Sequence, residues 1–348
     1  MNNDMTKKRP FKILSIDGGG IKGLYSSIIL EHLEEEFCKK NGTSISDYFD
    51  MICGTSTGGL IALALSVKTP ASQISQLYKL RGADIFPNST KKQKFLNYFR
   101  KIGYRGKYKN VALRKELESM LSDKTMSDSN NLLCIPSFNL TAGSPTVWKY
   151  PHSEGNYKRD GKVKMVDVAL STSAAPTYFP IHEIHPHGQF IDGGVWANNP
   201  TLCGVLEAIE FYLNQTIPNK EITFNTLEVL SISSVNSPMA QALNGKLNKS
   251  FLDWQDKLFH PFFEGQSFFS DRFMNNAVTK IYPQSIYHRI KSPDLSPEHA
   301  KEIDLDKVDK TSIKLLEMLG NKTGNDYCSA KRNLVEPFFR EKKTYKTF

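Results

Sequence analysis

The sequence has few cysteines, no long apolar run and no apolar segment near its start. The cysteines stand singly, without a C-x-x-C pair, and this spacing favours reduced, buried thiols over a disulfide framework. No run reaches the roughly 18 apolar residues that a membrane-spanning helix needs. The opening MNNDMTKKRP lacks the apolar core of a secretory signal. We therefore expect a globular protein of the cytoplasm. The five cysteines are Cys38, Cys53, Cys134, Cys203 and Cys328.

Acidic residues are missing from one stretch of a chain whose formal net charge is +9. Residues 91–110, KKQKFLNYFRKIGYRGKYKN, contain eight Lys or Arg and no acid, with aromatic residues interleaved. A stretch of this kind suits an anionic membrane surface or a nucleotide phosphate, and it suits a solvated surface segment equally well. The sequence leaves these three interpretations open.

Strand and helix patterns alternate along the first two thirds of the chain. FKILSI (11–16) is typical of a buried strand, and a helical pattern follows the glycines that come after it. YFDMIC (48–53) and the apolar LIALALSV (60–67) repeat the plan. This alternation predicts an α/β fold with a mainly parallel sheet between helices. We expect a polar tail at 1–10, a core at 11–235, and a mostly helical cap or appendage at 236–348.

A Gly-x-Ser-x-Gly sequence, GTSTG (54–58), lies between the second strand and its helix. A sharp turn there would expose the hydroxyl of Ser56 above the sheet, and the flanking glycines would relieve crowding. The alternative is a structural turn with a capping serine. The flanking strand and apolar helix favour the nucleophile interpretation.

A nucleophilic serine needs a base, and no histidine of this chain stands in a context that marks it as one. The cluster HEIHPH (182–187) is a candidate metal site or, more simply, a polar surface turn. Asp192 in FIDGG ends a predicted strand before two glycines, so its carboxylate could take the proton of Ser56 directly. The alternative is an aspartate that opens a turn.

The run SIDGGGIKG (15–23) is nearly bare of side chains. Backbone amides of Gly18, Gly19 and Gly20, next to a helix start, suit either an oxyanion or a phosphate. Actin-like sugar kinases also carry Asp-Gly-Gly-Gly, but there the chain turns back as a strand, whereas here it enters a helical pattern. The dinucleotide fingerprint lacks its acid on the second strand, and no Walker G-K-[ST] occurs. These observations favour the oxyanion.

Taken together, the motifs at 17–23, 54–58 and 192–194 resemble those of the patatin-like phospholipases, in the same order; SAAPTYFP (173–180) and WANNP (196–200) resemble further family signatures. The resemblance covers about residues 11–235. It implies a three-layer α/β sandwich, a Ser56–Asp192 dyad, an oxyanion hole at Gly18–Gly20, and hydrolysis of lipid acyl esters without a metal or cofactor. One departure is SISSVNS (231–237), where many relatives have Leu-Gly-Thr-Gly.

Within that family the chain resembles bacterial cytosolic effectors of anti-phage signalling. The resemblance implies a cyclic dinucleotide activator and the cell's own phospholipids, at the inner membrane surface, as substrate. No DNA or RNA duplex is expected, and a homo-oligomer is left open. The aromatic region 251–273 is a candidate lid or simply a packed helical core. The alternatives are a catalytically idle lipid or nucleotide sensor and a nucleotide-dependent phosphotransferase.

Overall fold

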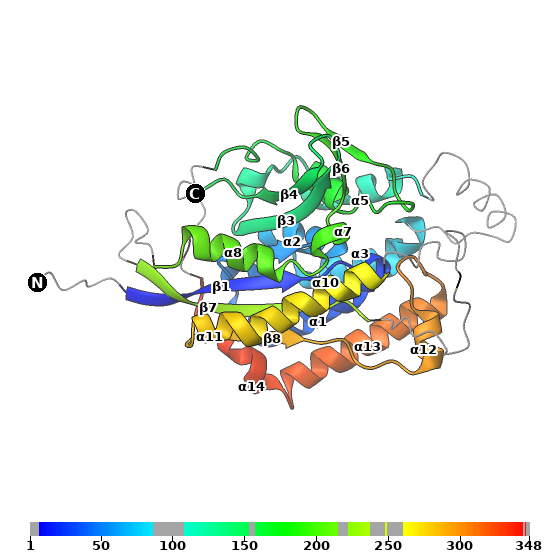
Figure 1. Ribbon diagram of the computed structural model, residues 1–348. Helices are drawn as coiled ribbons and strands as arrows, with labels where there is room; N and C mark the ends of the chain where they lie inside the picture. Colours follow the sequence, from blue (N-terminus) through cyan, green and yellow to red (C-terminus); the bar gives the residue numbers. More distant parts are fainter. Residues whose placement is uncertain are drawn as a thin grey trace, which may run out of the picture.

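A mixed β-sheet forms the centre of the protein in a computed structural model (Figure 1). The structure describes residues 7–85, 108–152, 157–214, 222–236, 248, 260–343 and 345. The strand order is β5-β6-β3-β2-β1-β7-β8, and β4 pairs with β3 beside this path. The strands are β1 (Lys7–Ile16), β2 (Met51–Gly54), β3 (Leu132–Asn139), β4 (Ser144–Lys149), β5 (His182–Ile184), β6 (Gly188–Asp192), β7 (Ile222–Ile232) and β8 (Ile286–Ile290).

The middle of the sheet is parallel. Strands β3, β2, β1, β7 and β8 pair in parallel, whereas β4, β5 and β6 pair antiparallel. In the register, Ile16 at the end of β1 lies between Gly54 of β2 and Ile232 of β7. The carboxyl ends of the central strands therefore meet at one edge, which is where open α/β sheets place their sites.

Helices cover both faces of this sheet, as the predicted α/β sandwich requires. Helix α8 packs on strands β1, β2 and β3 from one side, where α10 is also drawn (Figure 1), and α2 packs on the same strands from the other. Helix α13 lies against α1. The α-helices are α1 (Gly23–Phe37), α2 (Thr57–Ser66), α3 (Ala71–Ile85), α5 (Val111–Leu121), α6 (Met165–Thr172), α7 (Gly194–Ala197), α8 (Thr201–Phe211), α10 (His260–Phe273), α11 (Thr279–Ile281), α12 (Pro297–Glu302), α13 (Lys310–Cys328) and α14 (Arg332–Val335).

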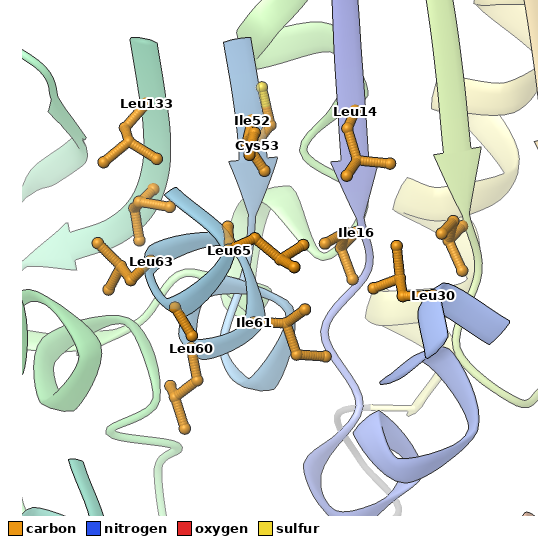
Figure 2. Packing of buried hydrophobic residues seen from close by; sticks show 14 of the residues in the cluster. Leu14, Ile16, Leu30, Ile52, Cys53, Leu60, Ile61, Leu63, Leu65 and Leu133 are labelled. Carbon is orange, nitrogen blue, oxygen red and sulfur yellow. The ribbon is translucent and has the colours of Figure 1, made fainter. Parts of the chain in front are cut away.

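The core lies where α1 and α2 meet the sheet. All ten residues of α2 are buried, which explains why its sequence lacks a polar face. Figure 2 shows Ile61 of α2 and Leu30 of α1 near Ile16 of β1. At roughly 25 cal/mol for each Å² of apolar surface removed from water, this packing is a main source of stability. It fixes the turn between β2 and α2, and with it the position of Ser56.

The structure differs from the sequence prediction at three places. Strand β1 begins at Lys7, within the predicted tail. The mostly helical segment after 235 also supplies β8, which pairs with β7 at the sheet edge. Its sequence IYHRI is only partly buried and lacks a strong apolar pattern, so the strand was not predicted. Residues His182–Ile184 form β5 rather than a turn. The domain division at 235 stays a prediction.

None of the helices in the described ranges has both the length and the apolar character needed to cross a bilayer.

Candidate active site

Ser56 lies on a strained turn between β2 and α2. Its φ is 53° and its ψ is −124°, a conformation that L-residues rarely adopt. Both neighbouring glycines are required sterically. A Cβ on Gly54 would lie 2.1 Å from the carbonyl oxygen of Gly58, and a Cβ on Gly58 would lie 2.2 Å from that of Ile16. The turn therefore has the form predicted for a nucleophile elbow.

The hydroxyl of Ser56 points at Asp192. Ser56 Oγ donates a hydrogen bond of 2.6 Å to Asp192 Oδ2. The other carboxylate oxygen, Oδ1, accepts the backbone N–H of Gly194 at 2.6 Å, which fixes the orientation of the carboxylate. Gly193 must be glycine, since a Cβ there would lie 2.2 Å from the carbonyl oxygen of Pro136. The two residues predicted as nucleophile and base are thus brought together.

Burial sets the electrostatics of Asp192. Only 4% of its surface is exposed, and burial raises the pKa of this carboxyl to about 6, against the lowering effect of the Ser56 and Gly194 hydrogen bonds. A carboxylate with a raised pKa is a stronger base, better matched to proton transfer near neutral pH.

The glycine loop lies beside this pair, but its three amides differ. The N–H of Gly18 donates to the carbonyl of Asn198 at 3.0 Å and is therefore engaged. Gly19 and Gly20 line the same cavity as Ser56, and their amides donate to no acceptor in the described part of the chain. A Cβ added to Gly19 would lie 2.1 Å from Ser234 Oγ. A Cβ added to Gly20, whose φ is +58°, would lie 2.1 Å from the carbonyl oxygen of Leu305. We keep Gly19 and Gly20 as candidate oxyanion donors.

Three contacts that hold the loop and the elbow were not predicted. Arg289 of β8 forms a buried ion pair with Asp17, the first residue of the glycine motif. The N–H of Ile21 donates to the carbonyl of Leu305 at 2.8 Å. The N–H of Ser56 donates to Thr172 Oγ1 at 3.1 Å, so this amide is occupied. Thr172 directly precedes SAAPTYFP (173–180), and this motif was the only sequence signal near it.

An apolar cavity opens beside the Ser56 hydroxyl; we call it the first cavity. Its wall combines residues from α2, α3, α5 and α10 with the glycine loop. The side chain of Phe263 on α10 lies within the predicted lid region, of which residues 251–259 are outside the described ranges. The cavity has the apolar lining that an acyl chain would need. Its apolar residues include Leu60, Tyr78, Ile85, Leu113, Phe179 and Phe263.

Two further regions were predicted as candidate sites: the histidine cluster at 182–187 and the basic stretch at 91–110. The described residues contain no group of three or more His, Cys, Asp or Glu placed to hold a metal ion, and His182 of the HEIHPH cluster lies 3.2 Å from Asp167 Oδ1. Of the basic stretch 91–110, only 108–110 fall within the described residues. There Tyr108 is buried and donates its hydroxyl to Asp306 Oδ2 at 2.6 Å.

Comparisons with known proteins find a matching family and several similar chains. The family model for patatin-like phospholipases matches residues 14–202. A cGAMP-activated phospholipase of Pseudomonas aeruginosa is 28% identical over 337 residues, which cover 97% of this chain and 92% of that protein. Another from Vibrio cholerae is 34% identical over 247 residues, 69% of each chain. Among solved structures, human GIVD cytosolic phospholipase A2 aligns with 95% of this chain and 60% of its own, with 10% identity and a TM-score of 0.44.

Proposed function

The chain belongs to the patatin-like phospholipase family and is a lipid acyl hydrolase, and we propose that it cleaves phospholipid acyl esters through a dyad of Ser56 and Asp192. The observation that carries the assignment is the 2.6 Å hydrogen bond from Ser56 Oγ to a buried carboxylate, with both residues lining an apolar cavity. A serine hydroxyl is a weak nucleophile until a base accepts its proton. Asp192 is the base in contact with it.

The reaction follows from this geometry in two halves. Asp192 accepts the proton of Ser56 as the Oγ attacks the ester carbonyl, and the amides of Gly19 and Gly20 stabilise the negative oxygen of the tetrahedral intermediate. Protonated Asp192 then gives the proton to the departing lysolipid oxygen, which leaves an acyl-enzyme. Water, deprotonated by Asp192, attacks the acyl carbon and releases a fatty acid and free Ser56.

A cyclic dinucleotide is the proposed activator. The support is that two relatives, which cover 97% and 69% of this chain, carry the name cGAMP-activated phospholipase. We infer a role as an effector of anti-phage signalling that works at the inner face of the cell membrane and degrades phospholipids there once the nucleotide is present.

The test is hydrolysis of phospholipid vesicles with and without a panel of cyclic dinucleotides. We expect activity in the parent protein, raised by one of the nucleotides, and its loss in Ser56→Ala and Asp192→Asn. Equal inactivity of all three proteins on every lipid, with each nucleotide, would favour an idle sensor. ATP consumption that persists in Ser56→Ala would favour a phosphotransferase.

A further inference from the structure

A second cavity, of about 370 Å³, is lined in part by the glycine-loop residues Asp17, Gly18 and Lys22 and does not include Ser56 in its wall. It shares three wall residues, Asn198, Phe263 and Leu305, with the first cavity, so the two are contiguous. Unlike the first, it has many polar and charged residues in its wall, from the loop, the end of β7, α10 and the segment after β8. Nothing in the proposed reaction uses these groups.

The most unusual of them is Lys22. Its side chain lines the second cavity, and only 6% of the residue surface is exposed. The ammonium makes neither a hydrogen bond nor an ion pair with any residue of the described ranges. Burial lowers the pKa of this group, which reflects the cost of keeping the charge out of water. Buried charges are normally paired, so an unpaired ammonium facing a cavity indicates a missing anionic partner.

Two hydroxyls in the same wall also lack partners. Ser233 Oγ and Ser234 Oγ are buried without a hydrogen bond to the described part of the chain, although both residues line the cavity. They belong to SISSVNS (231–237), the stretch where this chain departs from the resemblance to patatin-like relatives. The departure therefore supplies two hydrogen-bond donors beside Lys22.

The acidic groups of the cavity are mostly compensated. Asp17 is paired with Arg289, and Asp271 lies 3.1 Å from Lys291. Asp294 is exposed, so water screens its charge.

The carboxyls of Asp17, Glu264 and Asp304 all interact with the Lys22 ammonium at longer range than an ion pair. Asp304 lies 3.6 Å from His260. Glu264 is half-buried, and burial raises the pKa of its carboxyl against the lowering effect of the Lys22 charge. The buried positive charge of Lys22 thus remains without a direct partner among the described residues.

We propose that the second cavity binds a phosphodiester, whose anionic phosphate is held by the ammonium of Lys22 and the hydroxyls of Ser233 and Ser234. A phosphate accepts several such charge-assisted hydrogen bonds at once. The chemistry is common to two sources, the headgroup of a phospholipid whose ester lies at Ser56 and a soluble cyclic dinucleotide. The proposal deepens the proposed function and rests on it for the identity of the ester.

The site is placed to influence the reaction. Lys22, in the wall of the second cavity, follows Gly19 and Gly20 of the first cavity in the same loop. On α10, Phe263 lines both cavities and the next residue, Glu264, lines the second. Gln266 holds α10 to the chain after Asp192, since its amide accepts the N–H of Asn199 at 2.8 Å and donates to the Asn199 carbonyl at 3.1 Å. An occupant of the second cavity would therefore lie against residues that also line the first cavity.

The experiment compares four full-length proteins: the parent, Lys22→Met, the double variant Ser233→Ala/Ser234→Ala, and Lys115→Met. Lys115 is an exposed residue of α5 and serves as the matched control. One arm measures kcat/KM on dihexanoylphosphatidylcholine and on dihexanoylglycerol, which carries the same acyl esters without a phosphate. The other arm measures binding of cyclic GMP–AMP by equilibrium dialysis, with Ser56→Ala added to each protein. Circular dichroism confirms folding.

If the phospholipid headgroup occupies the cavity, Lys22→Met should lower the ratio of kcat/KM on the phospholipid to kcat/KM on the diacylglycerol by about tenfold or more. The double serine variant should lower this ratio by a smaller factor. Use by the nucleotide predicts a loss of about tenfold or more in cyclic GMP–AMP affinity with that ratio unchanged. If Lys22→Met does not fold, the double serine variant decides.

The proposal is overturned if the folded variants match Lys115→Met in both arms. That result would leave the proposed function intact, provided that the parent cleaves both esters through Ser56. Absence of Ser56-dependent cleavage of either ester would instead remove the proposed function, whatever the binding arm shows.

Discussion

Ser56 Oγ and Asp192 Oδ2 lie 2.6 Å apart across 136 positions of sequence. Strand β3 connects them, because it pairs with β2 on one side and with β6 on the other. Cys53 of β2 is level with Cys134, and Asp192 of β6 is level with Ser137. Ser56 lies three residues past Cys53, in the turn that leaves β2, so the register of these strands brings that turn toward Asp192.

Removal of either member of this pair should abolish activity without unfolding the protein. Ser56→Ala and Asp192→Asn are each expected to lower kcat on a phospholipid ester by about 1000-fold or more. Ser119→Ala, at an exposed position of α5, is the matched control and should retain parental kcat. Residual activity above a few per cent in Ser56→Ala would point to another nucleophile.

The pH profile should report the ionisation of Asp192. Only the carboxylate can accept the Ser56 proton, and burial raises its pKa to about 6. We expect kcat/KM to be constant at neutral pH and to fall tenfold per pH unit below about 6, measured with a soluble ester. A profile flat down to pH 4.5 would contradict the role of Asp192 as base.

The same shift makes a prediction for stability. The pKa of Asp192 rises from its ordinary 3.8 to about 6 on folding, so the native state holds this proton more tightly than the unfolded state. Its contribution to the free energy of unfolding is therefore largest below pH 3.8 and is lost as pH rises through 6. Asp192→Asn should be more stable than the parent at pH 8 and little different at pH 4, as measured by urea denaturation. The opposite order would mean that the native state stabilises the ionised carboxylate.

Glycine at the elbow is predicted to be irreplaceable. Gly58→Ala places a Cβ 2.2 Å from the carbonyl oxygen of Ile16, and neither backbone can move without displacing β1 or α2. We expect loss of soluble, folded protein or a destabilisation of several kcal/mol, on the order of the largest single-site effects. Gly265→Ala on α10 is the control, since no atom lies within 4 Å of its Cβ, and its melting temperature should equal or exceed that of the parent.

The buried ion pair between Asp17 and Arg289 should matter to the glycine loop. Arg289→Met leaves the Asp17 carboxylate buried without its partner, which typically costs about 3–5 kcal/mol. The double variant Asp17→Asn/Arg289→Met should be less destabilised than Arg289→Met alone. Urea denaturation of the single and double variants measures this coupling, and additive effects would show that the pair contributes none.

Much of this site could be predicted from the sequence, because short motifs encode local geometry. At the glycines around Ser56 and after Asp192, a neighbouring backbone atom occupies the space that a Cβ would need. Any other residue would clash there, so the sequence must carry glycine at these positions. Strand β1 and helix α2 were also predictable, because the apolar pattern that marks each of them lies within a single short segment.

Other features depend on contacts between distant segments, and the sequence pattern could not reveal them. The engagement of the Gly18 amide by Asn198 follows from the approach of two loops about 180 residues apart. Arg289 reaches Asp17 only because β8, a short and half-buried strand, joins the sheet edge. Lys22 has no direct partner among the described residues, and this likewise depends on which side chains of α10 and the β7 end surround it.

The central claim is that Ser56 is the nucleophile and that Asp192 activates it. An alkyl fluorophosphonate, which modifies activated serines, can be incubated with the full-length protein and the adduct located by peptide mass spectrometry. We predict a single adduct on Ser56, formed at least about 100-fold more slowly in Asp192→Asn. An adduct on another residue, or labelling of Ser56 at the parental rate in Asp192→Asn, would contradict the account.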